Sequence, residues 1–81
     1  MNKERVQELV LALLEEIGED PKREGLQRTP HRVAESWEFL VSGYQTDVKS
    51  VVNGAVFSVE SNNMIISRDI EVYSLCEHHL L

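Results

Sequence analysis

The chain has 81 residues, of which 42% are hydrophobic and 27% charged, a composition typical of a folded protein and not of a disordered one. Its 8 basic and 14 acidic residues give a formal net charge of −6 and are spread along the chain, which excludes the broad basic face that binds nucleic acid. No apolar run approaches the roughly 20 residues of a membrane span. Without a secretory leader, and with Cys76 as the single cysteine, the sequence predicts a cytoplasmic protein.

The first predicted element is an amphipathic α-helix between Asn2 and Gly18. Asn2 is suited to cap the N-terminus of this helix, and Gly18 stands where a glycine commonly ends one. Between them, apolar residues recur at helical spacing and form one stripe: Val6, Leu9, Val10, Leu13, Leu14 and Ile17.

A charged connector over residues 19–28 leads to a second predicted helix. Thr29 and Pro30 are typical of an N-cap followed by proline at the first helical position, and Gly43 is expected to end the helix. The apolar stripe of this helix, with two aromatic residues expected in the core, consists of Val33, Trp37, Leu40, Val41 and Tyr44. Two amphipathic helices joined by a short loop predict a helical hairpin over residues 1–45.

Residues 46–81 are predicted to begin a second domain that contains strands. Asp47 is a candidate cap for a short helical turn over residues 47–53, and residues 55–59 have an extended pattern. From residue 64 onward polar and apolar residues alternate, and the face expected toward a core, with Arg68 among its members, carries Met64, Ile66, Ile70 and Val72. Asp69 and Glu71 fall on the other face and are expected in solvent. The predicted fold class is α+β.

The segment from Cys76 to His79 contains the residues with the clearest chemistry. A Cys-x-x-His pair is a soft and borderline ligand set whose spacing suits Zn²⁺, and His78 is a third candidate nitrogen. Zinc takes three or four protein ligands, so the pair predicts half of a zinc site. The spacing alone leaves a second interpretation open, in which a buried cysteine stands beside two surface histidines.

Several segments together resemble the GTP cyclohydrolase I family, and they follow one another in the same order from the first helix to Leu81. They are Asp20-Pro21-x-Arg23-Glu24-Gly25-Leu26, Thr29-Pro30-His31-Arg32-Val33-Ala34, Gly43-Tyr44, Asn53-Gly54-Ala55, Arg68-Asp69-Ile70-Glu71 and Ser74-Leu75-Cys76-Glu77-His78-His79. The last of these is the most specific.

The resemblance implies a zinc hydrolase that opens the imidazole ring of GTP and yields formate and 7,8-dihydroneopterin triphosphate, the first step of folate and pterin synthesis. It implies the tunnelling fold, an antiparallel sheet with helices on one side, of which this chain would hold the N-terminal hairpin and the first strands. It also implies a homo-oligomer, a toroidal decamer with active sites between subunits.

Residue by residue, the resemblance implies that Cys76 and His79 are the first two zinc ligands and that His78 is the catalytic histidine. An imidazole exchanges protons near neutral pH, which suits that role. Arg32 matches an arginine that helps to hold the triphosphate, and a guanidinium binds phosphate oxygens in pairs. The position three residues further on, which can be basic in the family, is Glu35 here.

The family's third zinc ligand, a second cysteine, has no counterpart in these 81 residues, nor do most of its GTP-binding residues. The chain by itself is therefore predicted to have no cyclohydrolase activity. Two alternatives from other classes stay open. One is a non-catalytic truncated subunit that joins or perturbs larger oligomers. The other is an interaction module in which Cys76 and His79 bridge zinc between two chains.

Overall fold

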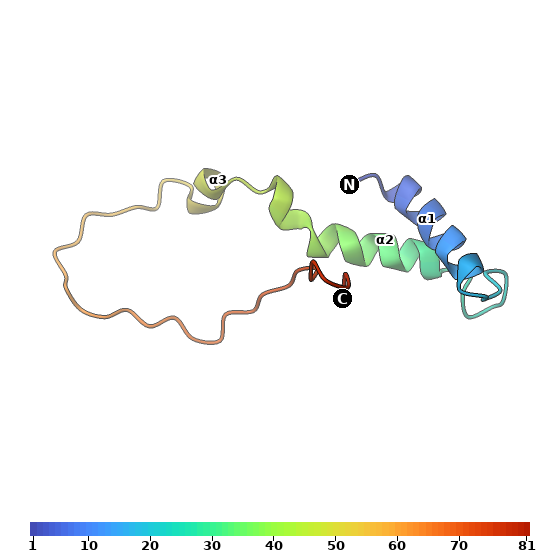
Figure 1. Ribbon diagram of the computed structural model, residues 1–81. Helices are drawn as coiled ribbons and strands as arrows, with labels where there is room; N and C mark the ends of the chain where they lie inside the picture. The colour runs from blue at the N-terminus through green and yellow to red at the C-terminus, as the bar shows by residue number, and fades with distance from the viewer.

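All the helices lie in the first two-thirds of the chain, and a mostly extended segment forms the remainder (Figure 1). The computed structural model describes residues 1–81. It contains helix α1 (Lys3–Glu16), helix α2 (Thr29–Leu40), the 3₁₀ helix η1 (Ser42–Gln45) and the short helix α3 (Val48–Val52).

Both predicted caps of α1 are confirmed. The side chain of Asn2 accepts a hydrogen bond from the backbone N–H of Arg5 at 2.9 Å. At the other end Gly18 has φ of 86°, its N–H donates to the carbonyl of Glu15, and the N–H of Glu19 donates to the carbonyl of Leu14. These two bonds form a Schellman motif, which satisfies carbonyls that the last turn of a helix leaves free.

Helices α1 and α2 run antiparallel and pack as a hairpin (Figure 1). The residues buried between them are Val10 and Leu14 from α1 and Ala34 from α2, and no other residue of the chain is buried. Trp37, which was expected in the core, is half-buried. The small Ala34 side chain is fully covered, so α1 can approach α2 closely at this point.

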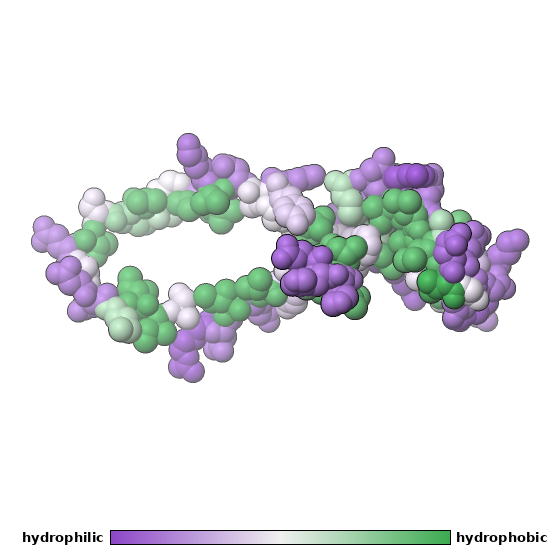
Figure 2. Space-filling model, viewed as in Figure 1, coloured by the Kyte–Doolittle hydropathy of each residue, from purple (hydrophilic) through white to green (hydrophobic).

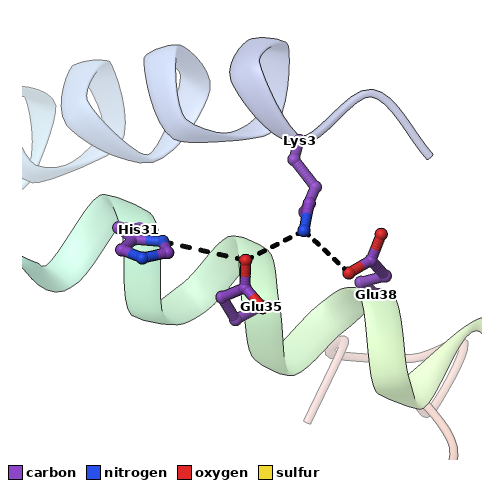
Figure 3. Close-up of polar contacts among 4 residues, drawn as sticks. All are labelled: Lys3, His31, Glu35 and Glu38. Carbon is purple, nitrogen blue, oxygen red and sulfur yellow. Dashed lines mark hydrogen bonds and ion pairs between the residues drawn. The ribbon is translucent and has the colours of Figure 1, made fainter.

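An ion cluster joins the start of α1 to the middle of α2 (Figure 3). The ammonium group of Lys3 lies 2.9 Å from Glu35 Oε1 and 3.0 Å from Glu38 Oε2. His31 Nδ1 lies 3.9 Å from the same Glu35 oxygen. The hydrogen bond to Glu35, supported by the one to Glu38, raises the pKa of Lys3, and the hydrogen bond from Lys3 lowers the pKa of Glu35.

Two details predicted for α2 are wrong. Thr29 is the first residue of the helix and not its cap; the cap position is Arg28, which makes no side-chain capping bond. The α-helix ends at Leu40, and Gly43 lies within η1 and does not end α2. A 3₁₀ helix has about three residues per turn, so the apolar stripe of α2 does not continue into η1. Tyr44, expected in the core, is accordingly 88% exposed.

The predicted turn after the hairpin is confirmed as α3. The side chain of Asp47 accepts a hydrogen bond from the backbone N–H of Ser50 at 3.1 Å, which makes it the N-cap. Asn53 follows in the left-handed region with φ of 49°, and Gly54 with φ of 71°. Two successive residues with positive φ end the helix, as the Asn-Gly pair predicts.

The predicted strands, and with them the α+β sheet of the tunnelling fold, are not found. Residues 57–75 make no backbone–backbone hydrogen bond, and the two limbs of the extended segment run well apart (Figure 1). A strand is stable only when a neighbour satisfies its backbone groups, and none lies beside this segment. Asp69 also has φ of 55°, which turns the chain within the predicted strand and interrupts its alternation.

The apolar face predicted for this strand is therefore in solvent, where Met64 is 86% exposed and Ile66 72%. The Cα radius of gyration is 19.5 Å, whereas a compact domain of this length has about 12 Å. The molecule measures 62 × 22 × 22 Å and resembles a hairpin that carries a long loop. None of its helices has the length and apolar character that would be needed to cross a bilayer.

Candidate functional site

The candidate metal and catalytic residues lie in a tight turn at residues 76–81. The N–H of Leu80 donates to the carbonyl of Cys76 at 2.9 Å, and the N–H of Cys76 donates to the carbonyl of Leu81 at 3.4 Å. Leu80 adopts a left-handed conformation with φ of 59°. The chain turns here and does not stay extended, so Cys76, His78 and His79 are presented together in one exposed place.

Within this turn the thiol contacts one of the two imidazoles. Cys76 Sγ lies 3.4 Å from His78 Nδ1, a distance at which sulfur and nitrogen share a hydrogen bond. The rings of His78 and His79 are 6.4 Å apart between centroids and tilted by 46°. His79, which the sequence pairs with Cys76, makes no hydrogen bond to the thiol.

The donor set of this turn matches zinc in chemical type but not in number. A thiolate and imidazole nitrogens are preferred zinc ligands. However, no group of three or more His, Cys, Asp or Glu side chains gathers with the geometry to hold a metal ion. The turn by itself therefore offers fewer donors than a zinc site needs, and further donors would have to complete the shell.

An aromatic contact holds the turn beside the hairpin. The rings of Phe39 on α2 and Tyr73 lie 5.4 Å apart between centroids at an angle of 55°, a tilted arrangement that aromatic pairs favour. A small cavity of about 190 Å³ adjoins this contact, lined by Leu40, Val41, Gly43 and Tyr44 on one side and by Tyr73, Ser74 and Leu75 on the other. Consequently the end of the chain returns to α2 (Figure 1).

Arg32 lies on the first turn of α2, exposed, and its guanidinium makes no hydrogen bond or ion pair. It is free to bind an anion, but the structure does not bring it into contact with the turn at residues 76–81. Glu35, three residues further along α2, is occupied by Lys3. The Glu35 carboxylate therefore links α2 to α1 through Lys3 and makes no ion pair with Arg32.

Two structural features were missed by reasoning from the sequence. The first is the Lys3 cluster, for which the signal is a base near the chain start and acids at residues 35 and 38, one helical turn apart. The second is the Phe39–Tyr73 contact. No spacing rule connects these two residues, because the loop between them sets their distance. Asp69 and Glu71, which were expected in solvent, are both exposed. Glu71 also accepts a hydrogen bond from the Tyr73 hydroxyl at 3.2 Å.

Comparison with known proteins gives one consistent answer. The sequence model of a family described as GTP cyclohydrolase I matches residues 6–81. GTP cyclohydrolase 1 of Leptospira biflexa is 53% identical over 76 residues, which are 94% of this chain and 42% of that protein. GTP cyclohydrolase 1 of Alkalilimnicola ehrlichii is 54% identical over 78 residues, 96% of this chain and 42% of the relative. GTP cyclohydrolase 1 of Neurospora crassa is 57% identical over 72 residues, which are 89% of this chain and 23% of that protein.

The family match covers nearly the whole chain, from within α1 through the Cys-Glu-His-His turn, and places the chain in a class of cyclohydrolases. The chain belongs to the GTP cyclohydrolase I family. It spans about two-fifths of the length of the bacterial relatives described above.

Proposed function

We propose that these 81 residues form one part of a zinc-dependent GTP cyclohydrolase I, which opens the imidazole ring of GTP to give formate and 7,8-dihydroneopterin triphosphate. The observation that carries the proposal is the family match over residues 6–81, which runs through the turn where a thiol and two imidazoles are presented together. Zinc, when bound, supplies Lewis acidity and lowers the pKa of a water molecule.

The residues of this chain bind the metal, transfer a proton and bind the phosphates. Cys76 and His79 hold the metal, together with donors outside this set. His78 moves a proton to or from the imidazole that opens. Its Nδ1 faces the thiol at 3.4 Å, so Nε2 is the nitrogen available to the substrate. Arg32, exposed and without a partner, binds phosphate oxygens of GTP.

The proposal predicts that the 81-residue chain alone, supplied with GTP and zinc, releases no formate above a protein-free blank. Two donors per chain hold zinc weakly, and the guanidinium and the turn are not in contact. Formation of dihydroneopterin triphosphate by the purified chain, with an intact mass of 9.3 kDa, would contradict this prediction.

A chimera tests the site residues in a complete enzyme. The 76 matched residues of the Leptospira biflexa relative are replaced by those of this chain, and formate release from GTP is measured. We expect activity to persist and His78→Ala to reduce kcat by about 10²- to 10⁴-fold, the usual contribution of a general acid or base. Arg32→Ala should raise KM more than it lowers kcat. His31→Ala and Arg28→Ala are the matched controls and should change neither parameter much.

An active chimera that tolerates His78→Ala would refute the role of His78 and leave the family function intact. An inactive chimera with native secondary structure, on the other hand, would refute the proposal that these residues serve a cyclohydrolase.

Metal binding is measured in the same chimera by zinc content after dialysis. Cys76→Ser is expected to lower the zinc content well below one per chain, because a serine hydroxyl is a poor replacement for a thiolate. His31→Ala should retain full zinc. Equal zinc in the Cys76→Ser variant would exclude Cys76 as a ligand.

A further inference from the structure

The turn after helix α3 contains the single Asn-Gly pair of the chain. Asparagines stand at residues 2, 53, 62 and 63, and Gly54 is the only glycine that directly follows one of them. This order matters chemically because the backbone nitrogen of the following residue can attack the carbonyl carbon of an asparagine side chain. Glycine has no side chain to block that approach. Asparagine is among the chemically labile residues of proteins.

Both reacting groups of this pair are exposed and free of hydrogen bonds. The side-chain amide of Asn53 has no partner, and the N–H of Gly54 donates to no acceptor. A Cβ placed on Gly54 would meet no atom within 4 Å, so solvent reaches the backbone nitrogen. The nucleophile and the carbon that it would attack are therefore both available.

Little holds the turn in its present conformation. Asn53 has φ of 49° and ψ of 41°, and its backbone has to rotate before the Gly54 nitrogen can come within bonding distance of the side-chain carbon. Every residue from 46 to 62 is exposed, and the chain beyond the hairpin surrounds open space (Figure 2). Only the hydrogen bonds from Ala55 N–H to Val52 and from Val56 N–H to Gly54 restrain this rotation.

The other three asparagines lack this combination. Each is followed by a residue that has a side chain. Asn2 is held as the N-cap of α1. Asn62 is followed by Asn63, whose backbone N–H donates to the hydroxyl of Ser61 at 3.3 Å and is thus less available as a nucleophile. The reaction is therefore specific to Asn53.

We propose that Asn53 is a site of spontaneous deamidation, with water as the only co-reactant. The Gly54 nitrogen gives its proton to solvent and bonds to Cγ of Asn53. The bond from Cγ to Nδ2 breaks, and Nδ2 takes up a proton and leaves as ammonia. The succinimide ring that results then adds one water molecule. Breaking the newly formed bond gives aspartate, whereas breaking the original main-chain bond gives isoaspartate.

The modification falls where the helical part of the chain passes into the extended part (Figure 1). Isoaspartate routes the main chain through the side chain and adds one carbon atom to it, so the left-handed cap of α3 is lost. Both products place a carboxylate at the C-terminal end of α3, where the helix dipole disfavours a negative charge. The reaction thus alters the connection between the hairpin and residues 55–81 as the protein ages.

Mass spectrometry of the intact 81-residue chain after incubation in water labelled with heavy oxygen tests the proposal. The chymotryptic peptide between Tyr44 and Phe57 contains Asn53 and no other asparagine. We expect this peptide to lose ammonia, to gain one labelled oxygen atom, and to separate into an aspartate form and an isoaspartate form. Asn62 and Asn63 in the same sample are the internal control and should remain amides over the same period.

Two variants test the role of the glycine. Gly54→Ala should slow the reaction several-fold, because a methyl group then stands beside the attacking nitrogen. Gly54 has φ of 71°, so alanine strains the turn, and circular dichroism checks that the helices remain. Asn63→Gly, which gives Asn62 a glycine neighbour in an exposed segment, should create a second labelled product at Asn62. Absence of that product would contradict the role given to glycine.

Three results would overturn the proposal. The first is that Asn53 keeps its amide, or loses it no faster than Asn62 and Asn63. The second is a product that contains aspartate but no isoaspartate, which would indicate direct hydrolysis without a ring. The third is a rate in the chain far below that in a synthetic peptide of residues 45–57, which would mean that the turn protects Asn53.

Discussion

Single side chains define where the helices of this protein begin and end. Asn2 and Asp47 each accept a hydrogen bond from a backbone N–H three residues later, and Gly18 and Asn53 each adopt positive φ after a helix. These interactions are local, since the partner atoms lie within a few residues of one another. That is why the sequence predicted all four of them correctly. The predicted Thr29 cap is the exception. Helix α2 starts at Thr29, one residue earlier than predicted, and Pro30 fits this start because it still lies in the first helical turn.

Removal of the α1 cap gives a prediction at this scale. Asn2→Ala deletes the acceptor for the Arg5 N–H and should destabilise the hairpin by about 1 kcal/mol, the usual cost of a lost N-cap. Helicity followed by circular dichroism during thermal unfolding measures the effect. Asn62→Ala, in the extended segment, is the control and should unfold as the original chain does. Identical unfolding of both variants would contradict the role of the cap.

At the scale of elements, the hairpin is held by a thin apolar seam and by one ion cluster. Three buried side chains are few for a stable pair of helices, and the exposed ion pairs from Lys3 to Glu35 and Glu38 add a small contribution that salt screens. The cluster predicts how the hairpin responds to pH. The pKa of Glu35 is lowered in the folded chain by its hydrogen bond from Lys3. Its stabilising contribution is therefore complete above the ordinary value of 4.5 and is lost as the pH falls below that value through the lower folded pKa.

The pH dependence of stability has the opposite sign at Lys3, because the pKa of Lys3 is raised, mainly by the hydrogen bond to Glu35. Its contribution is complete below the ordinary value of 10.5 and is lost as the pH rises above that value. We expect hairpin helicity to be greatest between these limits.

Lys3→Met keeps most of the side chain and removes the charge, so it tests the cluster directly. The variant should show a flatter loss of helicity on acidification than the original chain, although the Glu19–Arg23 pair in the connector leaves some acid sensitivity in both. Lys22→Met, at a lysine without an ion pair, is the matched control. An acid titration that is the same for Lys3→Met and the original chain would show that the cluster does not stabilise the hairpin.

At the scale of the whole molecule, the division between helical and extended parts predicts very unequal stability. Residues 57–75 have no backbone–backbone hydrogen bonds, whereas α1 and α2 have complete helical ladders and pack on each other. Hydrogen exchange should be close to that of an unfolded chain over residues 57–75 and slower in the two helices. Chymotrypsin should cut first at Phe57 or Tyr73, where both side chains are exposed, and release a helical fragment. Protection of residues 64–72 equal to that of α2 would contradict this prediction and indicate a paired strand.

The sequence by itself determined the helices, the caps of α1, the turn at Asp47 and the motifs of the family, because each depends on residues that lie close together along the chain. It also placed Cys76, His78 and His79 in one short segment. Their roles, and that of Arg32, stay predictions. The tertiary structure decided what depends on distant partners. It joined Lys3 to α2, brought Tyr73 against Phe39, left Leu9 and Leu13 of α1 in solvent, and left the alternating segment without a sheet. An alternating pattern specifies which side chains share a face, but a strand forms only when another strand supplies its hydrogen-bond partners, and that is a property of the assembled molecule.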